Sequence, residues 1–411
     1  MKKYIFPLSI FFLAAFVLSL QSCSDIQANT ETAATAPAKT EIPQLLPRTE
    51  GLGSVDERVQ VNQTYDDNVL VLKQDPGNAD ARINLASLFI QEARVTGEHP
   101  YYYPNALGLL NPLLGRTDLN QEQQFYAHYL TASVQLSQHE FAKALEEGEK
   151  AQQIYPHLAA VYGVLIDAHV ELGNYEKAVE LSDKMVSMRP DLRSYSRISY
   201  LRELHGDPNG AIEAMEMAVG AGMAGYEQTA WCRVTLGELH ETYGDLKAAE
   251  MHYEIALQER ADFPFAYAGL ASIYQQQGDL EKALEYLEKA IALIPEVGFY
   301  EQKANVLAEM GRVEESEALV PEILGMIQED IEGGHIMDLE LAAVQLDLAK
   351  DPDAALVAAR KAEEKRPDNI EVQRMMAKIH AARGEDQIAK EYVSKARRIG
   401  WQAPDLLALA Q

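Results

Sequence analysis

The sequence is poor in cysteine and in basic residues. It has 2 cysteines, and its 36 lysines and arginines face 63 aspartates and glutamates, so the net charge is −27 at pH 7. So strong an acidic balance argues against nucleic-acid binding, because the phosphate backbone would be repelled. It also argues against a protein that lies flat on anionic lipid.

Known catalytic and cofactor motifs are also missing. The sequence contains no H-E-x-x-H, no G-x-S-x-G, no Walker-type loop and no paired C-x-x-C. Its 10 histidines are scattered and lack the clustered spacing of metal ligands. We therefore predict no catalytic residue, no metal site and no cofactor, and we expect that the protein is not an enzyme.

What the chain does have is one short turn signal that recurs about every 34 residues. A fixed period of this size predicts a stacked repeat protein, in which each unit packs only on its neighbours. Glycine fills most of these turns because it tolerates the left-handed backbone that ends a helix. The turns are His139-Glu140, Gly173-Asn174, Gly206-Asp207, Gly244-Asp245, Gly278-Asp279, Gly311-Arg312, Lys350-Asp351 and Gly384-Glu385.

Residues 264–297 show one unit most clearly. Apolar residues recur at helical spacing on both sides of Gly278, and Pro295 closes the second helix. Each unit is therefore predicted to be a helix, a tight turn and a second helix.

Small residues recur at three positions of the unit, where two helices must approach closely. Position 8 holds Ala132, Gly237, Ala271, Ala304, Ala343 and Ala377; position 20 holds Ala144, Ala178, Ala211, Ala249, Ala283, Ala355 and Ala389; position 27 holds Ala151, Ala218, Ala256, Ala290, Ala362 and Ala396. Four departures from the pattern are Ile166 and Ser199 at position 8, Ser316 at position 20 and Ile323 at position 27.

These positions make the sequence resemble the tetratricopeptide repeat. The resemblance implies an all-α fold, a right-handed superhelical solenoid of about nine repeats over residues 54–403. The first unit, 79–124, is degenerate: the stretch GEHPYYYPNA reads as an inserted loop, with the second helix starting near Asn105. Residues 331–335 are a further insertion, and residues 404–411 form a short tail or cap.

The N-terminus resembles a bacterial lipoprotein signal peptide. Two lysines precede an apolar run over residues 4–20, and Leu20-Gln21-Ser22-Cys23 resembles the lipobox, whose cysteine receives the lipid. An uncleaved membrane anchor and an ordinary secretory signal are the alternatives. With Cys23 lipidated, Cys232 has no disulfide partner and is predicted to be a packing residue.

Residues 23–53 are rich in Ala, Thr, Pro and Glu and are predicted to be a flexible tether. The chain is thus expected in the bacterial cell envelope as a membrane-anchored lipoprotein of the inner or outer membrane, facing the periplasm rather than the cell surface. Contact with the membrane would be through the N-terminal lipid alone.

The resemblance implies that the first helix of each unit lines a concave groove. The positions that face it are acidic with aromatic anchors, which suits a peptide with basic and apolar side chains. The alternative is that these charges are solvated and the rings only pack. The candidate groove residues are Tyr126, Tyr129, Asp167, Arg193, Arg197, Tyr200, Trp231, Glu238, Phe265 and Gln275.

Two functional hypotheses follow. The first is a non-enzymatic, lipid-anchored scaffold that binds other proteins or peptides through the groove, with self-association through the end repeats left open. The second is a solute-binding lipoprotein that presents a glycan or peptide to a transporter. The second depends on Trp231, Phe265 and the Tyr101–Tyr103 run, which reads either as a projecting contact or as a cap over the first repeat.

Overall fold

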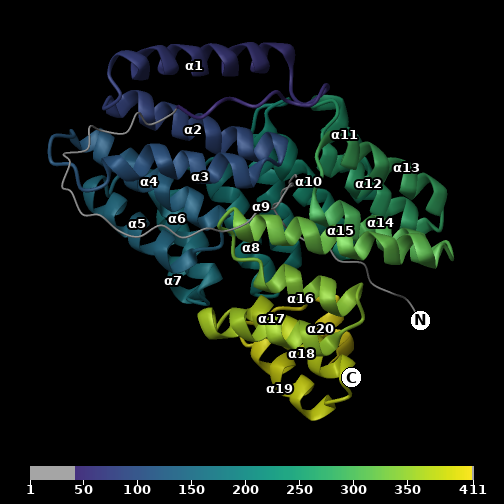
Figure 1. The fold of residues 1–411 in the computed structure, drawn as a ribbon. Coiled ribbons are helices and arrows are strands. Elements are labelled where there is room, and N and C mark those ends of the chain that lie inside the picture. Colours follow the sequence, from purple (N-terminus) through teal and green to yellow (C-terminus); the bar gives the residue numbers. More distant parts are fainter. Residues whose placement is uncertain (1–41, 410–411) are drawn as a thin grey trace, which may run out of the picture.

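The computed structural model describes residues 42–409, and in this range every regular element is helical (Figure 1). The helices are α1 (Val55–Gln74), α2 (Ala79–Thr96), α3 (His99–Leu110), the 3-10 turn η1 (Asn111–Leu113), α4 (Gln121–Ser137), α5 (Phe141–Ile154), α6 (Ala159–Glu171), α7 (Tyr175–Met188), α8 (Leu192–Leu204), α9 (Pro208–Ala221), α10 (Glu227–Thr242), α11 (Leu246–Glu259), α12 (Pro264–Gln277), α13 (Leu280–Leu293), α14 (Val297–Glu309), α15 (Val313–Glu332), α16 (Asp338–Asp347), α17 (Pro352–Lys365), α18 (Ile370–Ala382), α19 (Asp386–Ala396) and α20 (Pro404–Leu409).

From α2 to α19 the helices pack as consecutive pairs, each joined by a tight turn. The all-α repeat fold predicted from the turn spacing is confirmed. Its packing follows from the small residues, because every one at positions 8, 20 and 27 is buried between helices. Gly237 shows how close the helices come, since a Cβ there would lie 2.5 Å from the ring of Tyr253.

Two serines that depart from the repeat pattern make the same contact in opposite directions. The hydroxyl of Ser199 donates to the carbonyl of Ala211, and that of Ser316 donates to the carbonyl of Ala304, each at 2.7 Å. In both units the bond crosses between positions 8 and 20 of one repeat. A buried serine is therefore tolerated at either position, because in both units its hydroxyl donates to a backbone carbonyl of the facing helix.

The first pair differs from the prediction of an inserted loop. α3 starts at His99, with Pro100 at its first turn, and continues through the tyrosines that were predicted to lie in the loop. Tyr102 and Tyr103 are fully buried. Proline suits the start of a helix, and apolar burial of these rings outweighs the turn tendency of the stretch.

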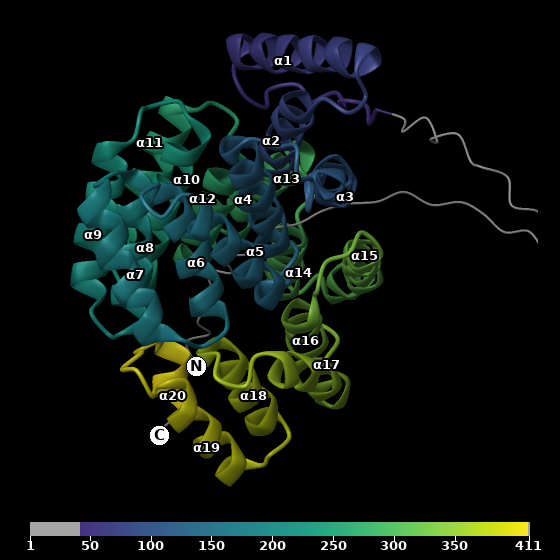
Figure 2. The same cartoon turned by 90° about the vertical axis from the view of Figure 1, so that its left-hand side faces the viewer.

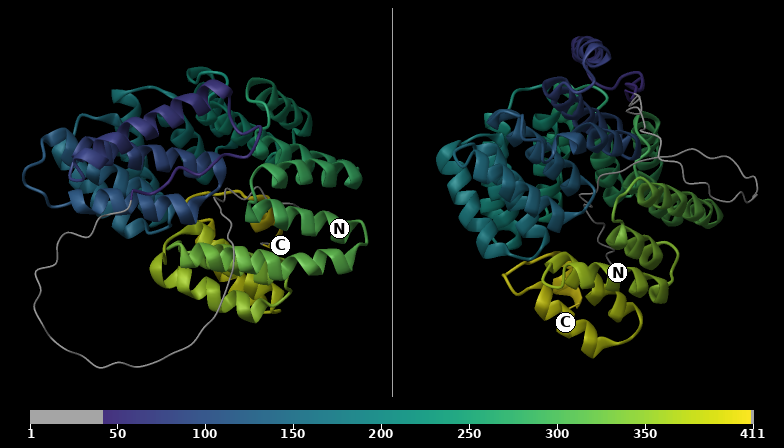
Figure 3. Two further views of the ribbon diagram at one scale, coloured as in Figure 1. Left: turned by 45° about the horizontal axis from the view of Figure 1, so that its top comes forward. Right: turned by 60° about the vertical axis from the view of Figure 1, so that its left-hand side comes forward.

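The predicted tether is wrong for residues 42–53, which lie against the first repeat. The Tyr102 hydroxyl accepts from the Leu46 amide at 3.0 Å, and the Tyr101 hydroxyl donates to the Gln44 carbonyl at 2.8 Å. Arg48 reaches Glu92, which is only 1% exposed. This segment lacks periodicity, but its backbone and one arginine satisfy polar groups that α2 and α3 would otherwise bury unpaired. α1 then crosses the outside of α2 (Figure 3).

The superhelix turns back on itself, so that the last repeats lie below α6 and α7 (Figure 2). Gln138 donates to Gly333, the Tyr175 hydroxyl accepts from Ile370, and Gln402 donates to Gly206. The sequence separations are 195, 195 and 196 residues, just under six repeats at about 34 residues each. One superhelical turn therefore takes just under six repeats, and the start of the second turn packs against the first. We call the three contacts Gln138–Gly333, Tyr175–Ile370 and Gln402–Gly206, with their neighbours, the inter-turn seam.

The C-terminal end is covered. Trp401 is 4% exposed and packs with Leu204 and Leu406, so α20 and the inter-turn seam together hide the last repeat. No helix within residues 42–409 is both long and apolar enough to cross a membrane. The predicted signal peptide and the lipidation site Cys23 lie outside the described residues.

Candidate binding cavity

Because the superhelix closes, the predicted groove becomes a central cavity of about 1290 Å³. Its wall is formed by the first helices of successive repeats, from α4 to α18, together with the segment that precedes α20. The structure brings nine of the ten predicted groove residues onto this wall: Tyr129, Asp167, Arg193, Arg197, Tyr200, Trp231, Glu238, Phe265 and Gln275.

Tyr126 is the exception. It is 37% exposed and contacts Phe125 edge to face, with 5.2 Å between ring centroids, but it does not line the cavity. It lies near the start of α4, where the wall is formed by the later residues Tyr129 and Ser133. The structure therefore places Tyr126 outside the cavity, and its role in binding stays a prediction.

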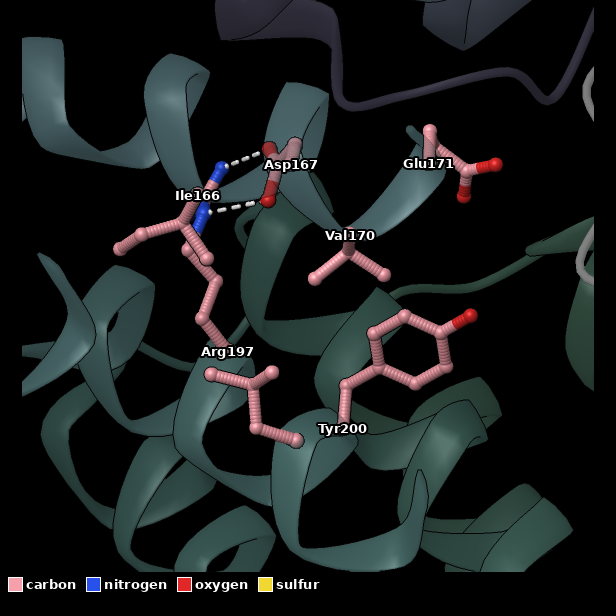
Figure 4. Close-up of a pocket in the computed structure, with 7 residues that line it drawn as sticks. Ile166, Asp167, Val170, Glu171, Arg197 and Tyr200 are labelled. Atoms are coloured by element: carbon pink, nitrogen blue, oxygen red, sulfur yellow. Dashed lines mark hydrogen bonds and ion pairs between the residues drawn. The ribbon is translucent and has the colours of Figure 1, made fainter. Parts of the chain in front are cut away.

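A side pocket of about 130 Å³ opens beside α6 and α8 (Figure 4). Its floor is apolar, made by Ile166, Val170 and Leu201, and polar groups surround it. Arg197 donates to both carboxylate oxygens of Asp167, at 2.8 and 2.5 Å. This bidentate pair joins two successive repeats and neutralises both charges.

Two further arginines of the wall come from the last repeats. Arg366 bonds to Glu171 at 2.5 Å, across the inter-turn seam. Arg374 bonds to Glu371 at 3.0 Å and to Asp405 at 2.9 Å. At Arg374 burial acts to lower the pKa, but Glu371 and Asp405 outweigh it and keep the pKa above its usual value. On this side of the cavity, each of the three arginines is bonded to at least one carboxylate.

The opposite side, on α8 and α10, carries acids with neutral partners only. Burial, together with the neighbouring Glu241 and Glu203, raises the pKa of Glu238 to about 8. Burial also raises the pKa of Glu203 to about 7, although a hydrogen bond from Tyr243 opposes the shift. Glu241 accepts from Tyr253 at 2.9 Å and from Gln276 at 2.6 Å.

Aromatic rings adjoin this acidic side. Trp231 and Phe265 meet edge to face, with centroids 5.1 Å apart and planes at 86°. Between Trp231 and Arg233 on α10, Cys232 is 2% exposed, and burial raises the pKa of its thiol to about 12. The thiol is thus kept protonated, as expected for a packing residue.

Sequence reasoning missed the cavity residues that the last repeats contribute. These are Arg366, Glu371, Trp401 and Asp405. Arg366 lies at the end of α17, a second helix that no groove rule would select, and it reaches the cavity only because the superhelix closes. No local pattern could have identified it.

The described residues 42–409 contain no group of three or more His, Cys, Asp or Glu side chains arranged to hold a metal ion. The shape, charge and aromatic surface of the cavity suit non-covalent binding of a ligand.

Comparisons with known proteins agree with this fold. Residues 264–297 match the family model of the tetratricopeptide repeat, and residues 160–189 match that of the PPR repeat. Each match covers a single helix-turn-helix unit, α12 with α13 for the first and α6 with α7 for the second. No curated protein matches it.

Several solved structures are similar at low identity. A human IFIT1 dimer with m7Gppp-AAAA is 13% identical, over 84% of this chain and 88% of that chain, with a TM-score of 0.47. TTC0263, a thermophilic TPR protein of Thermus thermophilus, is 20% identical over 52% of this chain and all of its own, with a TM-score of 0.39. The APC/C hetero-tetramer Cut9-Hcn1 gives 12% identity over 80% of this chain and a TM-score of 0.44, and this chain spans 58% of that one.

Proposed function

We propose that this protein is a non-enzymatic scaffold that takes a peptide segment of a partner protein into its central cavity. The observation that carries the proposal is the 1290 Å³ cavity, whose wall gathers nine residues that repeat position alone had selected. A cavity of this size exceeds most small-molecule pockets and suits an extended chain of several residues. Tetratricopeptide-type repeats, which stack into long concave surfaces, favour the same reading.

We further propose that the scaffold is held at a bacterial envelope membrane by lipid on Cys23. The lipobox-like segment and the basic, apolar N-terminus support this. Of the predicted tether, residues 42–53 are fixed to the first repeat, and residues 23–41 lie outside the described residues. Nucleic acid is not the expected ligand, because eleven acidic residues line the cavity against five arginines.

A solute-binding lipoprotein is the second candidate. One observation favours it: the Trp231–Phe265 pair could stack on a sugar or an aromatic side chain. The other observation that motivated it, the Tyr101–Tyr103 run, is weakened, because Tyr102 and Tyr103 are buried in α3 and only Tyr101 is partly exposed.

The test is affinity capture of envelope proteins with the full chain, purified in detergent and compared with two variants. Trp231→Ala/Phe265→Ala removes the aromatic pair of the cavity. Tyr126→Ala, its control, removes an aromatic residue of α4 that lies outside the cavity. Circular dichroism would verify that both variants fold.

The proposal predicts one or a few stoichiometric partners that the double variant loses and the Tyr126 variant retains. Equal capture by all three proteins would show that the cavity is not the binding site. A Cys23→Ser variant, followed by membrane fractionation, tests the anchor separately, because it should move from the membrane to the soluble fraction.

A further inference from the structure

The charges of the cavity wall divide into two sectors. In the first, the arginines Arg197, Arg366 and Arg374 pair with acids within bonding distance. In the second, no ion pair joins a lysine or an arginine to the acids in the described part of the chain. We call this second sector the acidic wall and define it by Glu203 of α8 and Glu227, Glu238 and Glu241 of α10.

The partners of the acidic wall are neutral or missing among the described residues. Glu203 accepts from the Tyr243 hydroxyl at 3.1 Å. Glu241 accepts from Tyr253, Ser272 and Gln276, which supply hydroxyl and amide donors but no charge. Across residues 42–409, Glu227 and Glu238 have neither a hydrogen bond nor an ion pair. Four carboxyl groups thus share one surface without a bonded cation. Arg94 and Arg260 act on Glu227 and Arg374 acts on Glu203 from beyond bonding distance, and these charges do not outweigh burial, which raises the pKa of both carboxyl groups.

A second observation points to a ligand that donates hydrogen bonds. Gln275 of α12 lies on the cavity wall, is 4% exposed and donates through Nε2 to Glu309 at 3.2 Å. Its Oε1 has no partner among the described residues. A buried amide oxygen left without a donor is costly, so a ligand that donates a hydrogen bond to it would be favoured.

The aromatic pair supplies the third element. Trp231 lies on α10, on the same helix as Glu227 and Glu238, and Phe265 lies on α12 beside it. Ring faces attract ammonium and guanidinium groups, and ring surfaces pack against the methylene stems that carry those groups. Acids next to aromatic rings therefore form a surface that matches lysine and arginine side chains.

We infer that the acidic wall binds a cationic, lysine- or arginine-bearing peptide segment of the partner protein. The charged ends bond to Glu238 and its neighbours, a donor of the segment bonds to Gln275 Oε1, and the side-chain stems pack on Trp231 and Phe265. This inference rests on the proposed function, since it gives the chemistry of the ligand that occupies the same cavity.

Titration supports it. A bound cation stabilises ionised carboxylates, so binding would release the protons that burial holds on Glu238, whose pKa is about 8, and on Glu203, whose pKa is about 7. Other titratable or charged groups that bear on this pair are Glu241 of α10, Tyr243 at the end of α10, and Glu371 and Arg374 of α18. Binding should therefore tighten as pH rises from 6 to 9.

The test is calorimetric titration of the full chain with three acetylated, amidated octapeptides: octalysine, octaglutamine and octaglutamate. Two variants are compared with the parent. Glu203→Gln/Glu238→Gln removes two carboxyls of the acidic wall. Glu216→Gln/Glu254→Gln removes the same charge from the exposed second helices α9 and α11.

The parent protein should bind octalysine and bind the other two peptides at least about tenfold more weakly. The wall variant should lose about tenfold or more in octalysine affinity, since charge-assisted bonds are lost, while the surface variant should match the parent. Equal octalysine affinity in both variants, or no octalysine binding to the parent, would overturn the inference. Neither result would contradict the proposed function, because that function is tested separately, by whether Trp231→Ala/Phe265→Ala loses the captured partner.

Discussion

Arg366 donates a hydrogen bond to the carboxylate of Glu171, a residue 195 positions earlier in the chain, at 2.5 Å. Asn369 adds a bond from its amide to the Glu171 backbone carbonyl at 3.0 Å. These contacts belong to the inter-turn seam, which converts an open groove into a cavity. Burial raises the pKa of Glu171 while Arg366 opposes the shift, so the bond stabilises a carboxylate in a place that disfavours its charge.

The inter-turn seam predicts that two turn glycines with the same backbone differ in their tolerance of a side chain. Gly173 and Gly311 have φ values of +79° and +77°. A Cβ on Gly173 would collide with the backbone carbonyl of Asp368, whereas a Cβ on Gly311 meets nothing within 4 Å. Gly311→Ala should cost about 1 kcal/mol for the left-handed backbone, and Gly173→Ala about 1–3 kcal/mol more for the displaced seam.

Urea denaturation would measure the two losses, and small-angle X-ray scattering would measure the shape. Gly173→Ala should enlarge the radius of gyration because the last repeats move away from α6 and α7. Gly311→Ala should leave the radius unchanged. Identical stabilities and radii for the two variants would show that the inter-turn seam does not hold the cavity closed in solution.

The N-terminal segment gives a second prediction. Arg48 bonds to Glu92 through Nε at 2.7 Å and to Glu57 through Nη1 at 2.8 Å, and Glu92 is almost fully buried. Arg48→Ala leaves the Glu92 charge buried without its partner and should cost about 3–5 kcal/mol. Arg116→Ala breaks the exposed pair with Asp118 and a bond to the Gly77 carbonyl, and it should cost far less than Arg48→Ala.

Thermal and chemical unfolding would compare these two variants. Adding Glu92→Gln to Arg48→Ala should recover part of the loss, because an amide is cheaper to bury than an unpaired carboxylate. Residues 42–53 should also become sensitive to protease in Arg48→Ala. A stability loss no greater than that of Arg116→Ala would mean that this segment does not contribute to the fold.

The repeat architecture could be predicted from the sequence because its causes are local. A glycine that ends a helix and an alanine between two helices each act within one unit, so their spacing reports the unit directly. The same positions selected Trp231, Phe265 and Glu238, which do line the cavity. Tyr126 occupies an equivalent repeat position but lies outside the cavity, because the wall begins a turn later along α4.

The closure of the superhelix could not be predicted, because it depends on a small rotation that accumulates over nearly six repeats. Gly173 and Gly311 occupy equivalent turns in the sequence, yet only Gly173 touches another superhelical turn. The same limit hid Arg366, whose role depends on where α17 lies relative to Glu171. The ordering of residues 42–53 was hidden as well, since single polar contacts with Tyr101, Tyr102 and Glu92 leave no periodic pattern.

Cys232 gives a third prediction. Its thiol is 2% exposed, and burial raises its pKa to about 12, so the reactive thiolate is scarce at neutral pH. In a Cys23→Ser background, a chromogenic disulfide reagent at pH 7.5 should react negligibly with the native protein and stoichiometrically once urea has unfolded it. Rapid reaction of the native protein would contradict the packing role.

The last prediction concerns Asp330, at the end of α15, and His335, in the loop that follows. Both side chains are buried, and His335 Nδ1 lies 3.7 Å from Asp330 Oδ1, too far for a hydrogen bond. Neither carboxyl oxygen of Asp330 has a hydrogen-bond partner among the described residues. Burial raises the pKa of Asp330 to about 9 and lowers the pKa of His335 to about 4.

The two shifts change stability in opposite directions as pH rises. Between its unfolded pKa of about 3.9 and about 9, Asp330 binds more protons in the native state, so its contribution to stability falls as pH rises. His335 is neutral in the native state, so its contribution falls as pH drops from about 6.5 to about 4. Asp330→Asn removes the dependence of stability on Asp330 titration and keeps the dependence on His335.

The Asp330→Asn variant should therefore gain about 1–3 kcal/mol in free energy of unfolding over the parent at pH 8, and less at pH 5. Asp66→Asn, on the exposed side of α1, should show no such trend. Urea unfolding of all three proteins at pH 5, 6.5 and 8 measures this, and parallel curves for Asp330→Asn and the parent would mean that Asp330 is not held protonated.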